Sequence, residues 1–318
     1  MKTNGGNVKL KGSVNNFVKF SLGQKDGFKA NLIATTNHFD LTNFIQKKNV
    51  KSVATKSNNS KIKISEKIAS TTENDFEFDI SLIAKKFLVR KVIANDANIK
   101  LHYKNKLLEI QSLEVNTCSG KLSAKGSIYD MNKIEANVTT DNINVNQLFE
   151  QFENFGQKAI QSNNIQGKVS LEAKMKMELD EKMEVIGNSI SSHIQFKLKD
   201  GHLLKYEPLQ KISDYIFKNR DFEDISFTEI NETFTINRFK MDIQEMEIAS
   251  NVLNLFMSGV YNFKDYSNIN ILIPWNNLKK RGKNYIPKNS EKAAEDLKGL
   301  KIHYSGMPNK MKVGLEYK

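Results

Sequence analysis

The chain has 318 residues, 39% of them hydrophobic and 26% charged, and this balance predicts a folded protein of one large or two ordinary domains. The net charge of +12 comes mainly from lysines, and four arginines are too few for a surface that reads bases and phosphates. Because the lysines are scattered along polar strand faces, nucleic acid is not expected as a partner.

Strict alternation of apolar and polar residues predicts β-strands along most of the chain. In the first part, strands are expected at Val8–Leu10, Phe76–Leu82, Ile99–Tyr103 and Leu122–Ile128. One short helix is expected at Leu41–Lys47. The segments Thr35–Ile45 and Thr139–Phe149 share the pattern of a strand end, a polar turn and a helix start. This echo predicts a repeated sheet-plus-helix module.

An amphipathic helix is predicted at Val145–Ala159, where apolar residues recur at helical spacing and should lie on the sheet. The next strand, Lys168–Leu179, shows the cleanest alternation in the chain. Its apolar face holds Val169, Leu171, Ala173, Met175, Met177 and Leu179. The strand is therefore expected to be long and apolar on one side only.

The remaining expected elements are strands at Ile194–Leu198, Phe239–Ile243, Ile269–Ile273 and Val313–Tyr317, and helices at Pro208–Ile216 and Glu291–Leu297. Short polar turns separate several strands, which favours antiparallel neighbours. The predicted fold is mainly β, with a few short helices and a long antiparallel sheet. Alternation alone leaves two outcomes open: a closed, dry core, or an open apolar groove.

Little in the sequence points to catalysis or to a cofactor. The single cysteine, Cys118, excludes an intrachain disulfide and any multi-cysteine zinc site. The histidines are far apart and lack the spacing of a metal-binding pair; they are His38, His102, His193, His202 and His303. Motifs such as GxSxG, GxGxxG and HExxH are absent. We therefore expect no enzyme activity, no metal site and no cofactor.

The N-terminal residues lack the apolar core of a signal peptide, and no run of about 18 apolar residues occurs. We therefore expect the sequence as given to be neither targeted nor membrane-spanning by itself.

The second half of the chain resembles the AsmA-like C-terminal region of Gram-negative envelope proteins. The resemblance covers Ile165–Lys318 and rests on an ordered set of short pieces. These pieces are Gly167-Lys168-Val169, Gly201-His202-Leu203-Leu204, Pro208-Leu209, Phe227-Thr228-Glu229-Ile230, Phe234-Thr235-Ile236, Phe239-Lys240-Met241, Ile248-Ala249-Ser250, Phe256 to Tyr261, Ile269 to Pro274 and Tyr304-Ser305-Gly306-Met307-Pro308.

This resemblance implies a relative of the AsmA and TamB group, with the sheet curled into an open groove (a β-taco) and helices on its ends or edges. It implies a repeated β-groove segment at 1–145, continuous with an AsmA-like region at 146–318. It also implies a periplasmic protein that carries phospholipid or another acyl lipid and supports outer-membrane lipid homeostasis. Inner-membrane tethering would come from a segment absent from this sequence, and outer-membrane or other envelope proteins would be further partners.

The apolar strand face is the predicted lipid-contacting surface. Its expected lining residues are Val169, Leu171, Met175, Met177, Ile194, Phe196, Leu198, Met241, Ile243 and Ile271. Lys279, Lys280 and Arg281 form a short basic loop that is expected to contact head groups or a protein partner. The alternative is a structural or regulatory envelope module whose apolar face is an internal core and whose edge strand binds a protein.

Overall fold

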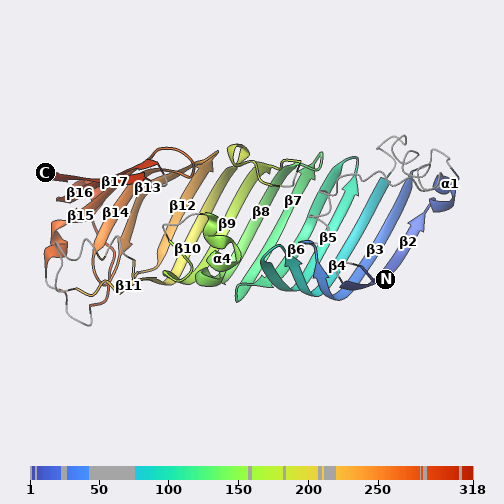
Figure 1. The fold of residues 1–318 in the computed structure, drawn as a ribbon, viewed down its shortest axis with the longest axis horizontal. Helices are drawn as coiled ribbons and strands as arrows, with labels where there is room; N and C mark the ends of the chain where they lie inside the picture. The colour runs from blue at the N-terminus through green and yellow to red at the C-terminus, as the bar shows by residue number, and fades with distance from the viewer. Residues whose placement is uncertain are drawn as a thin grey trace. The chain divides into compact units, whose positions relative to one another are not determined.

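The computed structural model describes residues 2–3, 6–22, 27–42, 76–156, 160–181, 184–206, 210, 220–279, 281, 285–307 and 310–317 (Figure 1). The strands in these residues are β1 (Lys2–Thr3), β2 (Gly6–Asn15), β3 (Phe28–Asp40), β4 (Phe76–Val89), β5 (Val92–Lys104), β6 (Leu107–Thr117), β7 (Gly120–Tyr129), β8 (Lys133–Asn144), β9 (Ile165–Glu178), β10 (Ser191–Leu204), β11 (Asp224–Ser226), β12 (Ile230–Asn237), β13 (Lys240–Ala249), β14 (Asn254–Asn262), β15 (Ser267–Pro274), β16 (Gly299–Met307) and β17 (Lys310–Tyr317). Their helices are short: α1 (Phe17–Ser21), α4 (Val145–Gln151), and the 3-10 turns η3 (Glu153–Gly156), η4 (Gly187–Ser189), η5 (Trp275–Leu278) and η6 (Ala294–Asp296).

The chain forms two compact units. Unit 1 comprises Met1–Thr117, Leu122–Ala136 and Glu178–Val185, and unit 2 comprises Cys118–Lys121, Asn137–Met177 and Ile186–Lys318. The predicted segments 1–145 and 146–318 follow the chain, whereas each unit collects residues from separate parts of it. Strands β7 and β8 contribute residues to both units.

The sheet of unit 1 is antiparallel except at one place. β1 pairs with β2, β2 with β3, β4 with β5 and β5 with β6, all antiparallel. β3 and β4 run parallel, with Phe28 opposite Phe76 at one end and Asp40 opposite Leu88 at the other. Parallel neighbours cannot be joined by the tight hairpin that joins antiparallel strands.

The two faces of this sheet differ in chemistry. Phe28 meets Phe76 and Phe78 edge-on, with ring centroids 5.1 and 5.4 Å apart, and Tyr103 lies beside Phe78. Glu77 points to the opposite face, where Lys29 and Lys104 stand opposite it on the two neighbouring strands. One face is therefore aromatic and the other carries cross-strand ion pairs.

The Glu77 carboxylate is expected to titrate well below an ordinary glutamate. Hydrogen bonds from Lys29 and Lys104 lower the pKa of Glu77 from 4.5 to about 2. Because the folded pKa is below the unfolded one, the stabilisation is complete above pH 4.5 and is lost as the pH falls towards 2. NMR titration of the side-chain carboxyl carbon measures this pKa directly. A Glu77 that titrates near 4.5 would show that the two lysines do not hold it in solution.

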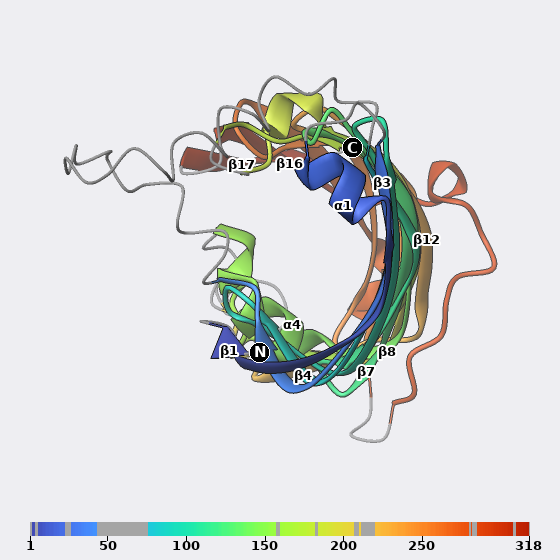
Figure 2. The ribbon, with the colours of Figure 1, turned by 90° about the vertical axis from the view of Figure 1, so that its right-hand side faces the viewer.

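In the described residues of unit 2, all pairings among β9 to β17 are antiparallel. Successive pairings join β9, β10, β12, β13, β14, β15, β16 and β17, and β11 pairs with the end of β10. In the described part of the chain, no pairing joins β17 back to β9, so this sheet does not close into a barrel. Its strands are bowed and give it a concave and a convex face (Figure 2). The predicted fold, a mainly β and mostly antiparallel open sheet, is confirmed.

Helix α4 begins where the sequence predicts a helix and ends sooner. The Asn144 side chain caps it by accepting a hydrogen bond from the backbone N–H of Gln147 at 3.0 Å. Glu153, Asn154 and Phe155 then adopt left-handed backbone conformations, with φ between 52° and 54°, which end the helix. The helix lies inside the curve of the unit 2 sheet, so the expectation that helices pack on ends or edges does not hold for α4 (Figure 2).

The other helix predictions fare differently. Most of Leu41–Lys47 and nearly all of Pro208–Ile216 lie outside the described residues. The predicted helix at Glu291–Leu297 is wrong: only the 3-10 turn η6 forms there.

The turn η6 belongs to residues 285–298, which we call the outer strap. Glu247 accepts hydrogen bonds from the backbone N–H of Ser290 at 2.7 and 2.9 Å, and Glu245 accepts one from the N–H of Ala294 at 3.0 Å, so two carboxylates of β13 hold the strap.

Candidate functional site

The predicted lining residues of unit 2 share one face of its sheet, which we call the inner face because α4 lies against it. On β9 and β10, Val169 stands opposite Leu198, and Leu171 opposite Phe196. The face continues through Met241, whose neighbour on β14 is Tyr261, and through Met257, which stands opposite Ile271. Strand register therefore brings together residues that are far apart in the sequence.

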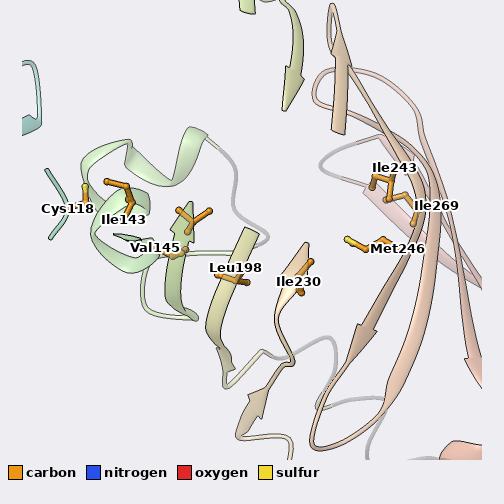
Figure 3. Close-up of a cluster of buried hydrophobic side chains, with 9 residues drawn as sticks. Cys118, Ile143, Val145, Leu198, Ile230, Ile243, Met246 and Ile269 are labelled. Atoms are coloured by element: carbon orange, nitrogen blue, oxygen red, sulfur yellow. The ribbon is translucent and has the colours of Figure 1, made fainter. Parts of the chain in front are cut away.

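Burial divides these residues into two groups. Val169, Leu198 and Ile243 are only 2%, 6% and 7% exposed, and they belong to a core cluster with Cys118, Ile143 and Val145. Figure 3 shows this cluster, with side chains from the strands and from the start of α4. The prediction that these three line an open surface is wrong, because they are buried within the core cluster.

The other predicted lining residues stay partly exposed. They are Leu171, Met175, Met177, Ile194, Phe196, Met241 and Ile271. We call this set the open apolar face. Phe234 and Ile236 on β12 continue it, since Phe234 stands opposite Ile194. In a concave sheet, adjacent side chains cover one another laterally, so partial burial here does not require a second layer.

Two glycines of the resemblance explain how the core region is packed. An added Cβ at Gly167 would lie 2.9 Å from a methyl group of Leu198, and one at Gly201 would lie 3.0 Å from its other methyl group. Gly167 also has a φ of 138°, which side chains rarely adopt. Both glycines therefore make room for Leu198, next to the irregular register between Lys199 and His202.

Sequence reasoning missed a carboxylate on the inner face. Glu232 stands directly opposite Phe196, and burial raises the pKa of its carboxyl group. Two tyrosines also face inward: Tyr261 and Tyr304 pack against the core cluster, and burial raises the pKa of Tyr304. The signal for Glu232 was present, because Ile230, Glu232, Phe234 and Ile236 form one alternating series. The inner face thus carries a few polar groups within an apolar surface.

The basic loop proposed for head groups has a different role at Arg281. Its guanidinium donates to the carbonyl of Ser250 at 2.6 Å and to the side-chain oxygen of Asn277 at 2.8 Å, and lies 4.3 Å from the ring of Tyr285. Burial lowers the pKa of Arg281. Arg281 is therefore a structural residue, and the prediction that it contacts head groups is corrected. Lys279 is exposed, and Lys280 lies outside the described residues.

One group of side chains in unit 1 has metal-ligand chemistry. Ligand atoms of Glu77, Asp79 and His102 lie within 4.8 Å of one another. Lys29 and Lys104 already form ion pairs with Glu77, and His102 lies 2.8 Å from Asp79. These cations compete with any metal ion for the same oxygens, so the group is better explained as an ion-pair network on a polar face.

Within the described ranges, no helix combines the length and the hydropathy that crossing a bilayer requires. Comparisons with protein-family models, with curated proteins and with solved structures found no match for this chain.

Proposed function

We propose that this protein is a non-enzymatic lipid-binding protein that holds or conducts acyl chains along the open apolar face of unit 2. The observation that supports this most is the separation of the inner face into a covered core and a partly exposed apolar surface. Leu171, Met175 and Ile194 lie on adjacent strands, are partly exposed and stay outside the core cluster, whereas Phe196, opposite Leu171, packs against that cluster.

The chemistry of this surface suits acyl chains. Each methylene group removed from water contributes about 0.8 kcal/mol, so a chain lying along several strands gains substantial binding energy without directional contacts. Methionine side chains such as Met175 and Met177 adapt to flexible hydrocarbon, because they are unbranched and polarisable. The polar outer face, with Lys174 and Lys176 on the same strand, remains in water.

The proposal also includes kinship with the AsmA-like group, on the ordered likeness of Ile165–Lys318 described above. Phospholipid as the cargo, a periplasmic location, a role in outer-membrane assembly and a membrane tether supplied by a further segment are parts of the same proposal. They depend on that likeness, whereas acyl-chain binding depends on the open apolar face.

Wild-type protein, purified under gentle conditions, is expected to carry phospholipid detectable by native mass spectrometry. Met175→Glu should reduce bound lipid at least tenfold, because a carboxylate on this surface loses its water when a chain covers it, and about 1.4 kcal/mol corresponds to tenfold. Met175 is a suitable site because its cross-strand neighbour is the uncharged Ser192, so the new carboxylate would not face another charge. Phe196→Glu is less suitable, since it would face Glu232.

The matched control is Lys174→Glu, which places the same side chain one residue away on the outer face. It should leave both bound lipid and the unfolding midpoint unchanged. Wild-type protein without lipid, or an equal loss of lipid in the two variants, would refute acyl-chain binding on this face.

Strand β17 favours a second candidate, binding of a protein by strand addition. It pairs with β16, and Val313 on β17 is 62% exposed. Such a partner would add a strand beyond β17. Lys312→Pro removes a backbone donor from this strand and should abolish strand addition without affecting lipid bound at Met175.

A further inference from the structure

A pocket at the rim of unit 2 adds a polar site to the apolar one. It has a volume of about 650 Å³, within the usual range for small-ligand sites, and lies where the β12–β13 and β14–β15 turns meet η4. We propose that it binds the phosphate group of a lipid whose acyl chains lie on the open apolar face. This inference rests on the proposed function.

Three cations line the pocket: Arg238 in the β12–β13 turn, Lys240 at the start of β13, and Lys264 in the β14–β15 turn. In the described part of the chain, neither Arg238 nor Lys240 forms an ion pair. The ammonium group of Lys264 lies 5.1 Å from the ring centroid of Phe239, which is also in the lining. Asp242 and Asp265 bring two negative charges, which leaves the lining with one net positive charge.

The local backbone holds Arg238 in place. It occupies the β12–β13 turn with a φ of 58°, and its N–H donates to the carbonyl of Ile190 at 2.6 Å. A guanidinium group presents paired donors that match two phosphate oxygens, and an adjacent lysine adds charge. The side chains that can contact a phosphate therefore come from a turn whose position is fixed by hydrogen bonding.

The opposite wall of the pocket is fixed by close packing. Asn188 lines it from η4, and η4 rests on Phe239: a Cβ added at Gly187 would lie only 2.2 Å from the Phe239 ring. Gly187 is therefore required for η4 to approach the ring and bring Asn188 to the pocket.

The pocket and the open apolar face share a strand. Lys240 and Asp242 line the pocket, and Met241 between them points to the opposite side of β13, where it belongs to the open apolar face. Met241 is the second residue of β13, so a chain lying over it ends near the β12–β13 turn, and the head group reaches the pocket around that turn. A phospholipid can place its chains on the inner face and its phosphate at Arg238 and Lys240.

The test uses a double variant, Arg238→Gln with Lys240→Gln, and short-chain probes in solution. Wild-type protein should bind dihexanoyl phosphatidylglycerol at least tenfold more tightly than dihexanoylglycerol, which lacks the phosphate. The double variant should lose this preference, because two charge-assisted hydrogen-bond partners are gone, and should still bind dihexanoylglycerol as before. The matched control, Lys168→Gln with Lys174→Gln, removes the same charge from β9 and should keep the preference.

The possible outcomes distinguish failure of the phosphate site from failure of acyl-chain binding. Equal binding of the two probes by wild-type protein, unaffected by the double variant, would overturn the phosphate site and leave acyl-chain binding intact. Binding of neither probe would overturn the proposed function itself. Inorganic phosphate that binds wild-type protein as tightly as the phospholipid would overturn the assignment to a lipid head group.

A variant that alters no charge provides an independent check. Gly187→Ala must displace the Phe239 ring or η4, and it should reduce the preference for phosphatidylglycerol over dihexanoylglycerol several-fold. An unchanged preference, with a ring shift detected by NMR, would show that the pocket's shape does not contribute.

Discussion

Asn277→Ala is expected to lower the free energy of unfolding of unit 2 by about 4 kcal/mol, because it leaves several buried polar groups without partners. The Asn277 side chain is fully buried. Its amide nitrogen donates to the carbonyls of Asn254 and Pro274 at 2.8 and 3.0 Å, and its oxygen accepts from the backbone N–H of Asn254 at 2.7 Å and from Arg281. Urea unfolding followed by the fluorescence of Trp275, the single tryptophan of the chain, measures the loss.

Asn276→Ala is the matched control for this experiment. Asn276 is adjacent and exposed, so its substitution should change the free energy of unfolding by about 0.5 kcal/mol or less. Arg281→Gln should also destabilise unit 2 while leaving lipid binding unchanged, which separates a structural arginine from a head-group contact. Equal stability of Asn277→Ala and Asn276→Ala would show that the amide network does not hold this corner of unit 2.

Leu198→Ala is expected to cost about 3 kcal/mol, since it opens a cavity that the surroundings cannot close. The backbones of Gly167 and Gly201 lie against the Leu198 side chain, which packs in the core cluster that includes Val145 of α4. Because backbone and a packed helix surround the site, they cannot move far enough to fill the cavity that the substitution leaves. Thermal or urea unfolding monitored at Trp275 reports this loss, because both residues lie in unit 2.

Leu171→Ala provides the control with the same residue type on the same face. Leu171 is on the adjacent strand, is partly exposed and lies outside the core cluster, so its loss should cost clearly less than that of Leu198. Lipid binding should show the opposite order from the free energy of unfolding: Leu171→Ala should weaken lipid binding more than Leu198→Ala does. Equal destabilisation by the two substitutions would indicate that the inner face is one continuous core.

Alternation was sufficient to predict the strands and the face to which each side chain points. The predicted strand Lys168–Leu179 corresponds to β9 (Ile165–Glu178), with Val169, Leu171, Met175 and Met177 on one side, because a two-residue period fits a strand. The start of α4 was also predictable, since helical spacing of apolar residues begins at Val145. These are local properties, and local sequence encodes them.

The features that sequence reasoning missed depend on contacts between distant residues. The parallel pairing of β3 with β4 joins residues 48 positions apart, such as Lys29 and Glu77, and nothing in either strand specifies its neighbour. Leu198 is buried and Leu171 is partly exposed because Leu198 packs in the cluster that includes Val145 of α4 and lies against Gly167 and Gly201. Neither contact can be read from the alternation of the strands. The role of Arg281 likewise follows from its acceptors, Ser250 and Asn277, rather than from its lysine-rich neighbourhood.

The position of Cys118 provides a kinetic probe of the helix on the inner face. The thiol is 4% exposed within the cluster that α4 helps to cover, and the carbonyl of Cys118 accepts a hydrogen bond from Asn144, the residue that caps α4. A thiol reagent can therefore react only when this region opens. Because the chain has one cysteine, the labelling rate as a function of reagent concentration measures the opening of the region around Cys118, to which α4 belongs. Slower labelling in the presence of a lipid would show that this lipid stabilises the region around Cys118 against opening.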